Sequence, residues 1–187
     1  MLKLKFCSQC GCSEVVSKVP PKDNVERQIC VICGFIFYHN PKVVVGAVVT
    51  YEEKYLLCRR NIEPQKGLWT FPAGFLENNE TIEEGVIRES FEEARITIEI
   101  QRLLGTYSLL AVNQVHLVYE AKMINDHYEN TAESSEVRLV ALDDIPWKDL
   151  AFPVIRWALK AHINSQGDNQ VDSKSTALPL EQSLLLD

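Results

Sequence analysis

The sequence predicts an α/β protein in which helices sandwich a mixed β-sheet, preceded by a small zinc ribbon. β-rich segments stand on both sides of one amphipathic helix near residues 82–94, and a second amphipathic helix at 152–162 closes this region. Two Cys-x-x-Cys pairs precede the first long strand. We therefore expect a zinc ribbon over residues 1–40, an α/β domain over 41–164, and a disordered tail over 165–187, which is rich in Ser, Gln, Asp and Asn.

The ribbon is predicted from Cys7, Cys10, Cys30 and Cys33, which form two pairs separated by 19 residues. A glycine follows each pair and allows the backbone to turn tightly around a metal. Four thiolates at this spacing are typical of a closed tetrahedral Zn²⁺ site, which holds a segment too short to bury a core. A disulfide pair or redox-active motifs are the alternatives, and Cys12 is expected to be a bystander. We expect the ribbon to be structural, helping the chain to dimerise or forming a wall of a substrate site.

The elements of the α/β domain follow from its apolar pattern and its turns. Strands are expected where β-branched or apolar residues lie between turn signals, at 42–51, 55–60, 68–71, 97–110 (broken near Gly105), 114–122 and 136–141. A turn at Pro72–Gly74 leads toward the first helix, and Pro153 suits the first turn of the second.

The helix after Gly74 is the most informative stretch. Thr81 and Glu84 form a capping-box pattern, in which a hydroxyl and a carboxylate satisfy the free N–H groups at the helix start. The residues at helical spacing that predict a buried stripe are Ile82, Val86 and Phe91, with Ile87 or Ala94.

Three carboxylates lie on the same helix at i, i+3 and i+4, namely Glu89, Glu92 and Glu93. This spacing places all three on one face within about one turn, where they repel one another unless a cation lies between them. Ligands that are all oxygen suit Mg²⁺ or Mn²⁺ rather than Zn²⁺. Arg88 precedes Glu92 by one turn and is placed to fix its side chain.

Charge and composition limit the possible partners. The net charge of the chain is −7, which argues against general nucleic-acid binding. Through Lys42 there are six basic and three acidic residues, a balance of +3, so the rest of the chain carries −10. No signal peptide or membrane-spanning run is found, so we expect a cytoplasmic protein that does not enter a membrane.

The stretch from residue 74 to residue 96 resembles the Nudix box, G-x₅-E-x₇-R-E-U-x-E-E-x-G-U, where U is a bulky aliphatic residue. The matching positions are Gly74, Glu80, Arg88, Glu89, Glu92, Glu93 and Ile96. Ser90 departs from the expected aliphatic residue and Arg95 from the expected glycine, so the end of this helix must be built without a glycine. The chain over about residues 5–160 is similar to the zinc-ribbon Nudix hydrolases, which implies a Nudix-type α/β/α sandwich.

The resemblance also implies a metal-dependent reaction. Members of the family hydrolyse a nucleoside diphosphate linked to another moiety, using Mg²⁺ or Mn²⁺. By resemblance the metal ligands are Glu89, Glu92, Glu93 and the carbonyl of Ala73, with Glu92 and Glu93 also catalytic. Arg88 is implied as a catalytic-site residue that holds Glu80 or Glu92 in place.

One more carboxylate is expected from the loop before the last strand of the domain. Glu133 is our first choice, and Glu136 and Glu129 are the alternatives. The base that activates water is then either a helix glutamate or this loop glutamate.

Substrate contacts are less well defined by the sequence. Arg59 and Arg60 end a strand near the box, where one of them could reach a phosphate, and Arg59 is our choice. The aromatic residues considered for stacking on the base are Trp69, Phe71, Tyr107 and Phe37, with Trp69 preferred.

The region after the box has no proline, unlike the proline-rich array of family members that prefer NADH. The proline that ADP-ribose hydrolases commonly carry at about this distance is missing as well. Over its whole length the chain is similar to plant-type zinc-ribbon members that cleave FAD or ADP-ribose, which implies a small-molecule nucleotide substrate, ADP-ribose or FAD, with release of AMP. Cleavage of NADH or another dinucleotide is the alternative activity, and a non-catalytic nucleotide-sensing module is the alternative class. Family members are often dimers, so a homodimer is expected.

Overall fold

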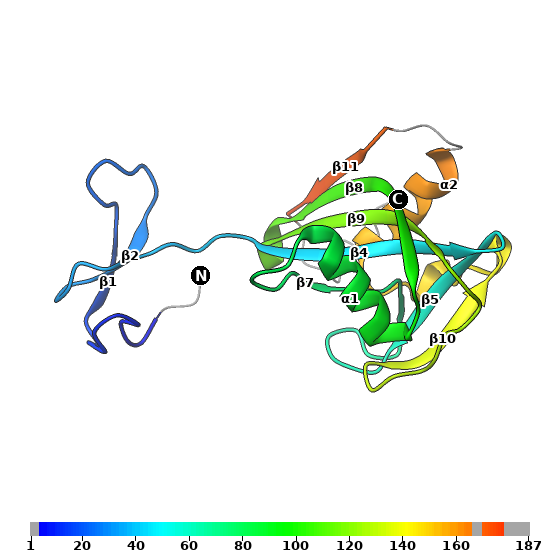
Figure 1. The fold of residues 1–187 in the computed structure, drawn as a ribbon. Coiled ribbons are helices and arrows are strands. Elements are labelled where there is room, and N and C mark those ends of the chain that lie inside the picture. Colours follow the sequence, from blue (N-terminus) through cyan, green and yellow to red (C-terminus); the bar gives the residue numbers. More distant parts are fainter. Residues whose placement is uncertain (1–3, 166–169, 178–187) are drawn as a thin grey trace. The chain divides into compact units, whose positions relative to one another are not determined.

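The computed structural model describes residues 4–165 and 170–177 and divides the chain into two compact units, residues 1–40 and 41–187. Figure 1 shows the ribbon unit in blue and the sheet and helices of the larger unit in cyan to red. The elements of the first unit are β1 (Val15–Lys18), β2 (Arg27–Cys30) and β3 (Ile36–Phe37). Those of the second are β4 (Lys42–Tyr51), β5 (Lys54–Arg60), β6 (Trp69–Thr70), β7 (Ala73–Phe75), α1 (Ile82–Ala94), β8 (Ile98–Leu109), β9 (Gln114–Met123), β10 (Ser134–Val140), α2 (Pro153–Ser165) and β11 (Asp172–Thr176), with short 3₁₀ turns at Leu110–Val112, Leu142–Asp144 and Trp147–Asp149.

The first unit is a three-stranded antiparallel sheet around a cysteine cluster. The Sγ atoms of Cys7, Cys10, Cys30 and Cys33 all lie within 4.8 Å of one another, and the Cys7–Cys33 and Cys10–Cys30 pairs are 3.6 Å apart. Bonds of about 2.3 Å to a tetrahedral zinc ion require sulfur–sulfur distances of about 3.8 Å, whereas a disulfide requires about 2.05 Å. The geometry therefore fits a zinc site and excludes disulfides among these four residues.

We expect Cys30→Ser to reduce the zinc content from about one ion per chain to well below half an ion, because it removes one of four ligands. Metal analysis of the purified protein measures this, with Cys12→Ser as the matched control outside the cluster. All three tryptophans lie beyond residue 40, so tryptophan fluorescence reports on the larger unit alone and checks that this unit is folded in each variant. A Cys30→Ser protein that keeps its zinc would contradict the assignment.

The larger unit is built on a mixed sheet in the order β10-β5-β4-β9-β8-β11, with β6 added to β5 and β7 added to β4. The β4–β9 and β8–β11 pairs are parallel and the others are antiparallel. A register shift between Leu103 and Gly105 interrupts β8 where the sequence predicted a break. The predicted α/β fold with a mixed sheet is thus confirmed. Among the described residues, no helix is both long enough and apolar enough to cross a membrane.

Each face of the sheet is covered by one helix (Figure 1). One core contains Val86 and Ala94 of α1 packed on residues of β4, β5 and β9. The other contains Val154, Trp157 and Leu159 of α2, together with apolar residues of β5, β8 and β9. This arrangement explains why β4, flanked by helices on both faces, is apolar almost throughout.

The predicted apolar stripe of the first helix is wrong in part. Val86 and Ala94 are fully buried, but Phe91 and Ile87 are about half exposed. The buried face instead contains Glu89 and Glu93 among its members. The apolar pattern missed this because two of the helix's inward positions carry carboxylates, which a periodicity argument assigns to solvent.

The predicted disorder of the tail fails for residues 172–176, which form β11. This strand pairs in parallel with β8 between Gly105 and Leu109. The outer edge of a long strand offers unpaired N–H and C=O groups, and a polar segment can satisfy them without an apolar face to bury. The parts of the predicted tail at residues 166–169 and 178–187 lie outside the described residues.

Candidate active site

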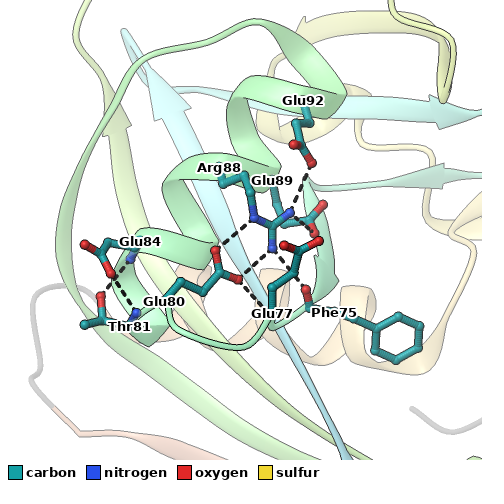
Figure 2. Close-up of polar contacts among 8 residues, drawn as sticks. All are labelled: Phe75, Glu77, Glu80, Thr81, Glu84, Arg88, Glu89 and Glu92. Atoms are coloured by element: carbon teal, nitrogen blue, oxygen red, sulfur yellow. Dashed lines mark hydrogen bonds and ion pairs between the residues drawn. The ribbon is translucent and has the colours of Figure 1, made fainter.

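The turn before α1 sets up the site. Thr81 caps the helix: its hydroxyl accepts a hydrogen bond from the N–H of Glu84 (3.2 Å), and the Glu84 carboxylate accepts one from the N–H of Thr81 (2.7 Å). Glu80 accepts a bond from the N–H of Glu77 (2.7 Å). The capping box predicted from the sequence is therefore present, and it fixes where the helix begins (Figure 2).

Arg88 organises the outer side of the site, as Figure 2 shows. Its Nε and Nη2 atoms donate to Glu80 at 2.9 and 2.8 Å, and Nη1 donates to Glu89 at 2.7 Å and to Glu92 at 3.0 Å. Nη2 also donates to the carbonyl of Phe75 (3.0 Å). The hydrogen bonds from Arg88 are the main reason why the pKa of Glu80 is lowered to about 2. The guanidinium thus joins the helix to the turn that precedes it.

Glu93 is the most buried carboxylate of the helix, with 6% of the residue exposed. It accepts a hydrogen bond from the N–H of Ala73 at 3.2 Å. Burial, opposed by that bond and reinforced by the nearby charge of Glu89, raises the pKa of Glu93 to about 8. Burial also raises the pKa of Glu89, against the effect of Arg88. Buried carboxylates with raised pKa values in a cavity mark a candidate catalytic site.

Two glycines allow Glu89 and Ala73 to lie close to the neighbouring backbone. A Cβ atom on Gly74 would lie 2.2 Å from Oε1 of Glu89. A Cβ atom on Gly46 would lie 2.5 Å from the Cβ of Ala73, which is its partner across β4 and β7. The box glycine is therefore needed because a side chain there would fill the space of a carboxylate.

The two departures from the Nudix pattern have structural solutions. Arg95 itself adopts the left-handed conformation (φ 57°) that a glycine would supply, and its N–H donates to the carbonyl of Phe91. Its guanidinium lies 4.9 Å from the centre of the Phe91 ring. Ser90 is fully buried and its hydroxyl donates to the carbonyl of Val86 at 2.8 Å.

The carboxylates open into a cavity of about 470 Å³ within the larger unit. Ala73, Glu89, Glu92, Glu93 and Glu133 all line it. Glu133 comes from the loop before β10, which is tied to the helix because the Thr131 hydroxyl donates to the carbonyl of Glu93 (3.1 Å).

The alternatives to Glu133 lie elsewhere. Glu136 pairs with Arg59 and Arg138, and Glu129 pairs with His127. Neither residue lines the cavity.

The structure gives no support for Arg59 or Trp69 as substrate contacts, because neither lines the cavity. Trp69 is packed in the core, and Arg59 donates to the carbonyl of Gly67. Arg60 lines the cavity instead: its Nε donates to the carbonyl of Pro64 (2.9 Å) and its guanidinium lies 5.0 Å from the centre of the Phe152 ring. Of the other aromatic residues considered, only Phe71 lines the cavity, and it is 1% exposed.

Several cavity residues were not singled out from the sequence, among them Phe75, Gln114 and His116. Phe75 lies within the box itself, and an aromatic residue just after the box glycine was a signal that could have been used. Gln114 and His116 begin β9, where no sequence pattern marks them.

The donor set of the cavity suits a hard divalent cation, since it consists of carboxylate oxygens. The carboxylate oxygens are less closely gathered than the four sulfurs: among the described residues only the cysteine cluster brings its ligand atoms within 4.8 Å of one another. Arg88 holds one oxygen each of Glu89 and Glu92. The Glu92 side chain is about half exposed. The residues therefore fit a divalent cation by the chemistry of their oxygen atoms.

The site combines a capped helix, buried glutamates that line a cavity, and an arginine that binds several of the carboxylates. These features are typical of Nudix hydrolases, and the comparisons with known proteins point to the same class. The chain matches the NUDIX domain family over residues 40–158 and the Nudix N-terminal zinc-ribbon family over residues 5–39. The chain belongs to the Nudix hydrolase family.

Among solved structures it is similar to a NUDIX hydrolase from Nitrosomonas europaea, with 43% identity and a TM-score of 0.87, covering 92% of this chain and 99% of that one. Among curated proteins, an ADP-ribose pyrophosphatase of Methanocaldococcus jannaschii is 41% identical over 71 residues, covering 38% of this chain and 42% of that protein. The NAD-capped RNA hydrolase NudC of Haemophilus influenzae is 34% identical over 104 residues, covering 54% of this chain and 38% of that protein. The match thus spans less than half the length of these two curated relatives.

Proposed function

We propose that this protein hydrolyses the diphosphate bond of a nucleoside diphosphate linked to another moiety, with ADP-ribose or FAD as substrate and AMP as a product. The observation that carries the proposal is the pair of buried carboxylates, Glu89 and Glu93, facing a cavity large enough for a nucleotide. A diphosphate is anionic and would be repelled by these groups, so the substrate and the carboxylates need divalent cations between them.

The chain's own residues have distinct tasks in this proposal. Glu89, Glu92, Glu93 and Glu133, with the carbonyl of Ala73, would hold Mg²⁺ or Mn²⁺. When bound, the ion would neutralise the negative charge of the carboxylates and the diphosphate and would make the attacking water more acidic. Arg60, fixed by the carbonyl of Pro64 and by Phe152, is placed to bind a phosphate oxygen. Glu93, buried and of raised pKa, or Glu133 accepts the proton from the attacking water.

Two observations favour ADP-ribose or FAD. A relative that is 41% identical over 71 residues is named an ADP-ribose pyrophosphatase. In addition, the absence of the proline-rich array of NADH-preferring members between Gly105 and Gln114 counts against NADH as the rival substrate.

A substrate panel tests the proposal. ADP-ribose, FAD, NADH, NAD-capped RNA, coenzyme A and diadenosine polyphosphates are each incubated with Mg²⁺ or Mn²⁺, and the products are separated by chromatography. We expect the highest kcat/KM for ADP-ribose or FAD, with AMP released and no turnover after the divalent ions are removed. If neither is cleaved while another member of the panel is turned over, the substrate assignment is wrong. Tight binding without any turnover would indicate a sensing module instead.

Glu133→Gln should lower kcat by roughly 10- to 100-fold, because it removes one charged ligand from the cavity. Glu129→Gln is the matched control, since Glu129 lies in the same loop but outside the cavity. Steady-state rates at several Mg²⁺ concentrations separate weaker metal binding from a slower chemical step. Equal rates for the two variants would remove Glu133 from the site.

A further inference from the structure

The cavity extends beyond the carboxylates along the sheet, and its second part has a defined wall. Phe75 of β7 lies opposite Val44 of β4, and Val44 lies opposite His116 of β9. Residues directly opposite each other on neighbouring strands project from the same face, and all three line the cavity. They form a row of side chains across three strands, which we call the Phe75–His116 row.

The strand register gives the distance of this row from the carboxylates. The neighbouring row on the same face is Ala73, Gly46 and Val118, two residues along β4 and β9. Two residues of an extended strand span about 7 Å. The N–H of Ala73 donates to Glu93, so the neighbouring row marks the diphosphate position of the proposed function. The Phe75–His116 row then lies about the length of a ribose beyond the diphosphate position, which is where the base of a nucleotide would lie.

Phe75 gives this part of the cavity an aromatic surface. The residue is 48% exposed and lines the cavity, while Lys42 lies 5.0 Å from the centre of its ring. Its carbonyl accepts a hydrogen bond from Arg88, and its ring points away from the arginine network (Figure 2). The backbone of Phe75 is thus fixed by the catalytic helix while its ring is left to contact a ligand.

His116 and Gln114 give the opposite side a polar edge of defined pattern. Nε2 of His116 lies 3.0 Å from Oε1 of Gln114. A carbonyl oxygen can only accept, so Nε2 carries the proton and Nδ1 of the neutral ring is an acceptor, while the amide of Gln114 keeps its donors. Burial lowers the pKa of His116 to about 4, which keeps the ring neutral at neutral pH. Among the described residues, neither side chain has another hydrogen-bond partner.

We infer that the Phe75–His116 row binds the adenine ring of the substrate: the ring lies over Val44 against Phe75 and turns its polar edge toward Nδ1 of His116, whose tautomer Gln114 holds. Adenine presents its amino group as a donor at this edge, which matches the acceptor Nδ1 of His116, and the hydrogen bond between Nε2 and Gln114 holds the imidazole in that tautomer. Guanine presents two acceptors at the corresponding edge and leaves Nδ1 unpaired. The inference rests on the proposed function, in which both preferred substrates contain adenine.

The test measures binding of the product AMP, and of GMP, by isothermal titration calorimetry in the presence of Mg²⁺. We expect wild-type protein to bind AMP roughly 10- to 100-fold more tightly than GMP. His116→Phe and Gln114→Leu should each bring the two dissociation constants close together. Phe75→Leu should weaken both nucleotides by about tenfold or more, because a base loses its aromatic contact.

The controls are exposed residues of the same types that do not line the cavity. Phe91→Leu is the control for Phe75→Leu, since the two residues are exposed to almost the same extent. His127→Phe is the control for His116→Phe, and Gln101→Leu for Gln114→Leu. Tryptophan fluorescence checks that each variant is folded. If His116→Phe does not fold, Gln114→Leu gives the same measurement independently.

The outcomes separate this inference from the proposed function. If AMP does not bind, binds no better than GMP, or is bound by the Phe75, His116 and Gln114 variants as well as by their controls, the inference is wrong even where hydrolysis is observed. If AMP binds selectively and depends on these residues but no substrate is cleaved, the adenine site stands and the proposed hydrolysis is wrong.

Discussion

Glu93→Gln is expected to lower kcat for the preferred substrate by at least about 100-fold, the range found when a positioned acid or base is removed. The amide keeps the shape of the side chain and can still lie against the N–H of Ala73, but it carries no negative charge and binds a proton poorly. Steady-state kinetics at saturating Mg²⁺ measure the effect. Glu84→Gln is the matched control, because Glu84 lies on the same helix in the capping box and does not line the cavity. Full activity of Glu93→Gln would remove this residue from the reaction.

The free energy of unfolding of Glu93→Gln provides a second test, and its measurement also shows whether the variant is folded. In buffer without added divalent ions, the pKa of Glu93 is about 8 in the folded protein against an ordinary value of 4.5. The folded state therefore holds one more proton than the unfolded state between these values, so wild-type stability falls as the pH rises from about 4.5 to 8. We expect Glu93→Gln to lack this loss and to be more stable than wild type at pH 8, by on the order of 3 kcal/mol, with a small difference at pH 5. Denaturant unfolding followed by tryptophan fluorescence measures both values.

Arg88→Met is expected to destabilise the larger unit by roughly 3 kcal/mol and to lower activity as well. The substitution keeps an apolar chain of similar length but leaves Glu80, Glu89 and Glu92 without their shared cation and the carbonyl of Phe75 without its donor. Arg88 is largely buried in this network, which is why we expect more than the fraction of a kcal/mol typical of exposed ion pairs.

Arg138→Met is the control for that experiment. Arg138 also pairs with a glutamate, but its side chain is 59% exposed, so its removal should change stability by less than about 1 kcal/mol. Adding Mg²⁺ should restore part of the stability lost in Arg88→Met, since a divalent ion can replace the missing positive charge among the carboxylates. Equal effects of the two substitutions would mean that Arg88 is an ordinary surface charge.

The fold could be predicted largely because its signals are local. The capping box at Thr81 and Glu84, the β-branched run of β4 and the two cysteine pairs each depend on residues close in the chain. The choice of Glu133 over its neighbours was also open to sequence reasoning, but only the structure places it in the cavity, because the loop is positioned by hydrogen bonds from Thr131 and Asn61.

Other features depend on contacts between segments far apart in the sequence. Arg59 and Arg60 are adjacent and chemically identical, yet successive residues of a strand face opposite sides. The pairing of β5 with β6 and β10 decides which one lines the cavity, and a register shifted by one residue would reverse the answer. The Phe75–His116 row likewise exists only because β7 and β9 pair with β4 at the same level.

The four-cysteine cluster, the start of the carboxylate helix and the family could all be predicted before the fold was known, since each depends on residue types at fixed short spacings. The tertiary structure decided which side of that helix is buried, which residues line the cavity, and that residues 172–176 complete the sheet. The physical reason is the same in each case: a short motif fixes its own geometry, whereas burial and strand register are set by whatever part of the chain packs against it.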